Sequence, residues 1–128
     1  MELSRREQAL NQQSRTDKVD PAIFDREHLS QYTNGDAALE RELVTLFLGQ
    51  FAPFRAQLDA ALSEQDWKFA AHSLKGSARS IGAPAIAALT EKLEVMGFDA
   101  PGRSKKRVLG HLDQAMSAFA DEVKKAFD

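Results

Sequence analysis

Apolar residues recur at helical spacing along most of the chain after residue 36. The longest stripe covers about seven turns, at spacings of three and four: Leu39, Leu43, Phe47, Phe51, Phe54, Leu58 and Leu62. The stripe stays in phase on both sides of Pro53, so this residue is expected to kink the helix without ending it. The pattern predicts a long core helix that starts after Asp36, a good N-cap residue.

A second apolar stripe follows after the short connection at residues 63–65. Between Asp66 and Gly82 the apolar positions are Trp67, Ala71, Leu74, Ala78 and Ile81. Asp66 is the expected N-cap of this helix, and Gly82 is placed to end it in a left-handed conformation. We therefore predict a second amphipathic helix in antiparallel contact with the first.

Two more helices and one short helix complete the pattern. Pro84 suits a first helical position, and the helix that it starts should end at the Gly97 break. The last helix is expected over residues 103–127, and a short one near residues 25–32 should end at Asn34-Gly35. Four long amphipathic helices with short loops predict an all-α, antiparallel, up-and-down four-helix bundle, preceded by one or two short accessory helices.

Composition limits the protein to one modest domain and few classes of partner. The 128 residues are 43% hydrophobic and carry a net charge of −2, which argues against binding nucleic acid or an anionic membrane. There are no cysteines, no signal-peptide core and no run long enough to cross a membrane, so a soluble cytoplasmic protein is expected. Residues 1–18 are expected to be a polar tail or loose helix, and residues 19–128 the bundle domain.

His72 lies away from the apolar face of the second helix. At helical spacings its neighbours include three long cationic side chains, Lys68, Lys75 and Arg79. Such surroundings suit an anion that is bound to, or built on, the imidazole. His28 and His111 lack such neighbours and are expected to be ordinary surface or boundary residues.

Gly76 is an unusual choice inside this helix, because glycine costs about 1 kcal/mol there relative to alanine. A helical side chain leans toward the N-terminus, so one at position 76 would cover the surface above His72. Glycine keeps the imidazole open to a large partner.

The outer face of the same helix offers a small docking surface. Phe69 is expected to be exposed about one turn before His72, beside the small residues Ser73, Gly76 and Ser80. Leu48 and Val44, at the edge of the first stripe, either extend this surface or belong to the core.

Three short motifs together resemble the signature of histidine-containing phosphotransfer (HPt) domains. They are His72-Ser73-Leu74-Lys75-Gly76-Ser77-Ala78, Gly82-Ala83 and Leu93-Glu94. The resemblance implies that His72 accepts a phosphoryl group from a receiver-domain aspartate and passes it to another. It further implies that Lys75 neutralises phosphoryl charge and that Gly76 lets the receiver approach. Glu94 would hydrogen-bond one imidazole nitrogen and leave the other, Nε2, as the nucleophile.

The resemblance also implies the partners of such a protein. The chain has no recognisable ATP-binding motif, so it should be a phosphohistidine carrier rather than a kinase, with no cofactor of its own. Mg²⁺ would come from the partner receiver domain, and the upstream partner would be a hybrid sensor histidine kinase. A monomer is expected. Two alternatives stay open: a non-catalytic helical module that binds receiver domains, and an isolated phosphotransfer domain of a chemotaxis-type kinase.

Overall fold

The computed structural model describes residues 19–127, and all of its regular structure is helical. Its helices are α2 (Arg26–Thr33), α3 (Ala37–Ala60), α4 (Glu64–Ile81), α5 (Pro84–Met96) and α6 (Gly102–Phe127). The predicted all-helical class is confirmed for this part of the chain, with one short helix, α2, ahead of the four long ones. The expected tail at residues 1–18 lies outside the described residues.

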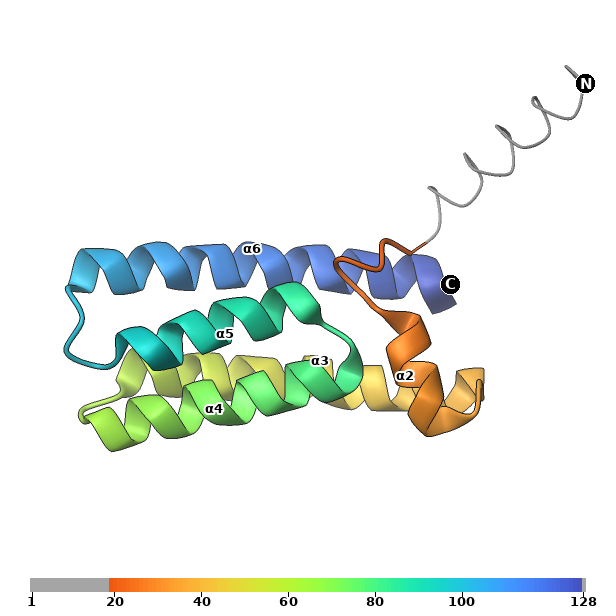
Figure 1. Cartoon of the computed structure of the whole chain (residues 1–128), viewed down its shortest axis with the longest axis horizontal. Coiled ribbons are helices and arrows are strands. Elements are labelled where there is room, and N and C mark those ends of the chain that lie inside the picture. The colour runs from red at the N-terminus through yellow and green to blue at the C-terminus, as the bar shows by residue number, and fades with distance from the viewer. Residues whose placement is uncertain (1–18, 128) are drawn as a thin grey trace, which may run out of the picture.

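The four long helices lie along a common axis, and successive ones run in opposite directions (Figure 1). Helix α4 packs against α3 and α5, and α6 packs against α5 and α3. The short helix α2 contacts α3 and α4 at one end of the molecule. Each long helix therefore has two long neighbours and keeps an outer face.

Aromatic side chains fill the core near α2. The ring of Phe119 lies edge-on to Phe24 and to Phe47, with centroid separations of 5.3 and 5.5 Å. Phe24 precedes α2 and is fully buried, so the segment before α2 closes one end of the core. Burying a phenylalanine side chain contributes about 1.5–3 kcal/mol, which makes this segment part of the folded unit.

Gly82 ends α4 in the left-handed conformation, at φ 84°, as the sequence predicts. Its carbonyl accepts a hydrogen bond from the Asp25 backbone N–H at 2.7 Å. A Cβ at position 82 would collide with the carbonyl of Asp25. Glycine is therefore required twice here, for the backbone conformation and for the close approach of the chain before α2.

The start of α4 differs from the prediction that Asp66 is the N-cap. The helix begins at Glu64, and the Ser63 hydroxyl accepts the Asp66 backbone N–H at 3.1 Å. Ser63 has extended backbone angles, φ −151° and ψ 161°, from which its short side chain reaches the first turn. Asp66 instead lies in the first turn, where a carboxylate favours the positive end of the helix dipole.

The long stripe of α3 faces the core only in its middle. Helix α3 runs through Pro53 as predicted but ends at Ala60, so Leu62 lies beyond it and is 87% exposed. At the other end Leu39 is exposed, and the inner position belongs to Glu40, which is 1% exposed. The predicted continuous apolar face from residue 39 to 62 is therefore wrong at both ends.

Candidate functional site

His72 lies in the middle of α4 on its outer side. Its neighbours Ala71 and Leu74 are fully buried, whereas the His72 side chain is 70% exposed. The alternation follows from the helical period, because the apolar face of α4 points into the core. The imidazole is therefore accessible from solvent while its backbone is held by a packed helix.

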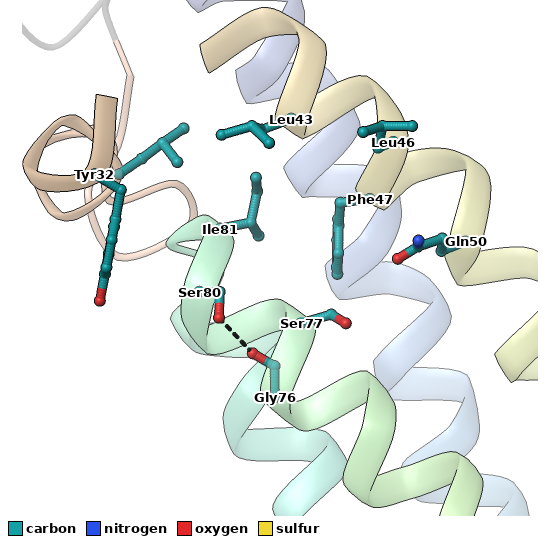
Figure 2. Close-up of a pocket in the computed structure, with 10 residues that line it drawn as sticks. Tyr32, Leu43, Leu46, Phe47, Gln50, Gly76, Ser77, Ser80 and Ile81 are labelled. Atoms are coloured by element: carbon teal, nitrogen blue, oxygen red, sulfur yellow. Dashed lines mark hydrogen bonds between the residues drawn. The ribbon is translucent and has the colours of Figure 1, made fainter. Parts of the chain in front are cut away.

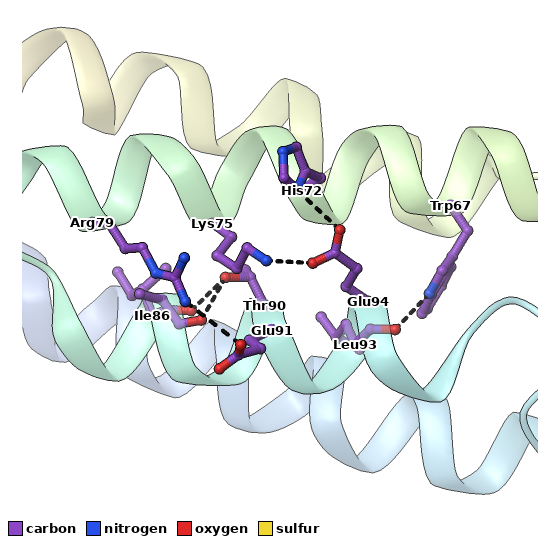
Figure 3. Close-up of polar contacts among 10 residues, drawn as sticks. Trp67, His72, Lys75, Arg79, Ile86, Thr90, Glu91, Leu93 and Glu94 are labelled. Carbon is purple, nitrogen blue, oxygen red and sulfur yellow. Dashed lines mark hydrogen bonds and ion pairs between the residues drawn. The ribbon is translucent and has the colours of Figure 1, made fainter.

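One carboxylate of α5 connects the two central residues of the site (Figure 3). The Oε2 atom of Glu94 lies 3.0 Å from Nδ1 of His72. Its Oε1 atom accepts a hydrogen bond from the ammonium of Lys75 at 2.5 Å. Glu94 and Lys75 are 21% and 12% exposed, so this pair is partly shielded from water. The expected contact between Glu94 and His72 is present in the structure, and the contact between Glu94 and Lys75 is one that the sequence analysis did not predict.

The carboxylate determines the protonation pattern of the ring. The hydrogen bond from Lys75 lowers the pKa of Glu94, partial burial opposes this, and the contact with His72 lowers the pKa further. An ionised carboxylate only accepts hydrogen bonds, so Nδ1 of His72 must carry the proton that lies between them. In the neutral imidazole Nε2 then keeps a free lone pair, which is what a nucleophile needs.

Lys68 and Arg79 do not join this group. Lys68 lies 3.8 Å from Glu64 on its own helix. Arg79 reaches across to Glu91 of α5 at 3.5 Å, well apart from the imidazole in Figure 3. Lys75 is thus the cation that shares a carboxylate with His72. The expected cluster of three cations around the ring becomes one cation and its acidic partner.

Gly76 has no packing reason to be glycine. A Cβ built at this position meets nothing within 4 Å, and its φ is not positive. The Ser80 hydroxyl donates to its carbonyl at 3.0 Å, which any residue at 76 would allow. A side chain at position 76 would therefore meet open space and would not disturb the packing of the fold.

The remaining predicted docking residues fall into two groups. Phe69 is 63% exposed with its ring near that of Phe54, Ser80 is exposed, and Ser73 is half-buried. Leu48 is half-buried and packs against the core, while Val44 is fully buried. Val44 therefore belongs to the core, which decides one alternative that the sequence left open.

A groove that sequence reasoning missed lies next to Gly76, between α2, α3 and α4 (Figure 2). It encloses about 610 Å³, and residues from all three helices line it: Leu29, Tyr32, Leu43, Leu46, Phe47, Gln50, Gly76, Ser77, Ser80 and Ile81. Tyr32 and Leu46 are 67% and 57% exposed. The sequence feature that could have indicated the groove is Leu46, an apolar residue that lies outside the apolar stripe of α3. Because Gly76 and Ser80 belong to both, the groove continues the surface beside His72.

Two searches of the described residues bear on other classes of function. Within residues 19–127 there is no group of three or more His, Cys, Asp or Glu side chains arranged to hold a metal ion. None of the helices there has the length and apolar character needed to cross a membrane.

Comparison with known proteins gives one result. The family model described as the Hpt domain matches residues 42–122, which include α4, α5 and most of α3 and α6. No curated protein and no solved structure gives a significant match. Hpt domains act in histidine phosphotransfer in two-component signalling, as carriers and not as kinases. The match covers more than half of the chain and contains His72, Lys75, Gly76 and Glu94, so the protein belongs to the Hpt domain family.

Proposed function

We propose that the protein is a phosphorelay intermediate that carries a phosphoryl group on Nε2 of His72. The observation that carries the proposal is the Nδ1 contact with Glu94, which leaves Nε2 unprotonated on a 70% exposed side chain. In the accepting step the Nε2–P bond forms as the aspartyl O–P bond of a receiver domain breaks. The donor aspartate leaves as a carboxylate, and the ring becomes a phosphorylated imidazolium.

Glu94 and Lys75 support this step by electrostatics. The imidazolium keeps its proton on Nδ1, and the Glu94 carboxylate at 3.0 Å stabilises the positive charge. Lys75 holds that carboxylate in place and adds positive charge near the phosphoryl group. Transfer to a second receiver aspartate reverses the step and restores the neutral ring.

The scaffold suits a carrier that depends on its partners. We infer that α3 to α6 form an antiparallel, up-and-down four-helix bundle, which holds α4 rigid while a receiver domain docks. The docking surface would comprise Phe69, Ser73, Gly76 and Ser80 together with the groove beside them. The receiver domain would supply Mg²⁺ and most of the catalysis, and a hybrid sensor histidine kinase would act upstream. A monomer suffices for this role.

The decisive experiment is transfer from a phosphorylated receiver domain. Incubation should label the protein in an acid-labile, alkali-stable way, and His72→Gln should lower labelling by at least about a hundredfold with an unchanged melting temperature. His28→Gln and His111→Gln are matched controls that should label like the wild type. Labelling that persists in His72→Gln would exclude this residue as the carrier.

The apolar groove favours one alternative function, a non-catalytic module that only binds receiver domains. Receiver binding without transfer from any of several phosphorylated receivers would support that alternative. The phosphotransfer domain of a chemotaxis-type kinase would instead be labelled from ATP when a separate kinase catalytic domain is added. A screen of donors therefore separates the three functions.

A further inference from the structure

Trp67 makes a buried polar contact one residue away from Glu94. Its side chain is 2% exposed, and the indole N–H donates to the backbone carbonyl of Leu93 at 2.7 Å (Figure 3). Trp67 lies on α4, five positions before His72, and Leu93 immediately precedes Glu94 on α5. The contact therefore joins the two helices that carry the site, next to the residue that orients the imidazole.

The imidazole depends on the position of α5 because little else holds it. The His72 side chain is 70% exposed, so packing leaves the ring free, and its hydrogen-bond partner comes from α5. Sliding one helix past the other by one residue moves it about 1.5 Å. Such a shift would lengthen the 3.0 Å contact between Nδ1 and Glu94 beyond hydrogen-bond distance.

The hydrophobic effect has no direction, so the axial position of two helices depends on the interdigitation of their side chains and on polar contacts between them. A buried N–H is different: it must keep its acceptor or lose its hydrogen bond in a dry environment. The Leu93 carbonyl also accepts the Gly97 backbone N–H at 3.2 Å, as the helix requires. The indole N–H therefore binds a backbone carbonyl whose position in α5 is fixed, and the helical hydrogen bond to that carbonyl is kept.

Other contacts between α4 and the region of α5 are more exposed. Glu64 accepts the Phe98 backbone N–H at 2.5 Å, but this contact lies at the surface, beyond the C-terminal end of α5. Arg79 and Glu91 are both more than half exposed, and exposed ion pairs hold helices weakly. The Lys105 ammonium of α6 lies 5.2 Å from the centre of the Trp67 ring. The pair of Lys75 and Glu94 is partly shielded, at 12% and 21% exposure, and it holds the carboxylate itself. The bond from Trp67 to the α5 backbone is more buried than any of these contacts.

We propose that Trp67 is a positioning residue of the phosphoacceptor site. Its indole N–H, bonded to the Leu93 carbonyl, sets the register of α5 against α4 and thereby holds the Glu94 carboxylate on Nδ1 of His72. The inference rests on the proposed function only in taking His72 as the phosphoryl acceptor.

The test removes the N–H and keeps the shape. Trp67 is the single tryptophan of the chain, so biosynthetic replacement by β-(3-benzothienyl)alanine, which has sulfur in place of N–H, alters this position alone. Nitrogen-15 NMR of the neutral His72 ring should show the Nδ1–H tautomer in the wild type and a mixture with Nε2–H in the analogue. The transfer rate at saturating receiver should fall about tenfold, while KM stays the same because the docking groove is untouched.

Three controls separate positioning from loss of stability. Trp67→Phe, which also lacks the N–H, should give the same tautomer mixture. Phe119→Leu, a change to a buried aromatic residue whose ring packs against Phe24 and Phe47, should lower the melting temperature and leave the His72 tautomer unchanged. In a Glu94→Ala background, replacing Trp67 should have no further effect on tautomer or rate.

An unchanged tautomer and rate in the benzothienyl protein would overturn the proposal and leave Trp67 as a core residue only. If the wild type accepts no phosphoryl group, the proposed function fails, but the tautomer measurement still decides whether Trp67 orients His72. The two failures are thus distinguishable.

Discussion

Glu40 and Glu94 are two carboxylates with similar partners and opposite surroundings. Glu40 is 1% exposed and accepts hydrogen bonds from Arg26, Ser30 and Thr33. Glu94 is 21% exposed and is shared between Lys75 and His72. Every partner of Glu40 lies on α2 or at its end, so that cluster fastens one helix to another. One partner of Glu94, His72, is instead 70% exposed, and the proposed function depends on this difference.

The largest effect on stability should come from replacing Glu40, the more buried of these two carboxylates. Glu40→Ala leaves the buried Thr33 hydroxyl and the partly buried Arg26 and Ser30 donors without this acceptor, which should lower the free energy of unfolding by about 3 kcal/mol and Tm by roughly 10 °C. Calorimetry measures the change, and phosphotransfer per folded molecule should stay at the wild-type rate. A drop in transfer with unchanged Tm would reverse the assignment.

Substitutions at two glycines, Gly76 and Gly82, test the same distinction between residues that stabilise the fold and residues that serve transfer. Gly76→Gln should cut transfer by more than about tenfold by covering the surface beside His72, yet Tm should stay the same or rise, because position 76 is open. Gly82→Ala is the opposite case: a positive φ and the Asp25 carbonyl make it destabilising. Parallel thermal and transfer assays test both. Equal losses of fold and transfer in Gly76→Gln would contradict the clearance role.

Glu94→Ala should affect transfer more than stability. Without the carboxylate, Nδ1 of His72 loses its acceptor and the imidazolium loses its counter-charge, so transfer should slow about tenfold. The change in Tm should be small, because the carboxylate is partly exposed. Glu91→Ala, which removes the exposed partner of Arg79 on the same helix, is a matched control and should transfer normally.

The smallest expected effect is on the pH dependence of stability. It distinguishes the contribution of Lys75 to the lowered pKa of Glu94 from that of His72. Since Glu94 has a folded-state pKa below its ordinary value of 4.5, its contribution to stability is present above that pH and is lost as the pH falls through the lowered pKa. Lys75 is the largest cause of the shift, so Lys75→Ala should raise the pKa of Glu94 toward 4.5. The free energy of unfolding should then depend less on pH in the acidic range. Carbon-detected NMR titration of the carboxyl group measures it.

Lys75→Ala should also slow transfer while receiver binding persists. An unchanged transfer rate would remove Lys75 from the mechanism and leave it as a structural partner of Glu94. An unshifted carboxyl titration would show instead that His72 holds the carboxylate ionised.

The sequence predicted the helices and the exposed side of His72 because both follow from the period of one helix. Partners supplied by a second helix were harder to predict. The sequence showed that Lys68, Lys75 and Arg79 lie on the same side of α4 as His72. The periodicity of α4 does not predict that Arg79 contacts Glu91, a residue of α5. Glu94 was named through the family resemblance, and its simultaneous contact with Lys75 required the packed pair of helices.

Glu40 shows why a hydrophobic pattern misplaces a buried charge. The stripe of α3 favoured Leu39 as the inward residue, since a carboxylate counts as polar in any periodicity. Its donors lie 7 to 14 positions earlier and become neighbours only when α2 folds back onto α3. The groove beside Gly76 escaped prediction for a similar reason, because three helices form its walls.

The bond between Asp25 and the Gly82 carbonyl has a consequence for the order of folding. It joins residues 57 positions apart, whereas α4 and α5 meet through a turn of two residues. Contacts between near neighbours in the chain form faster than those that close long loops. We expect the α4–α5 hairpin, which carries His72, Lys75 and Glu94, to assemble early, and the segment before α2 to close over the finished turn as a late step.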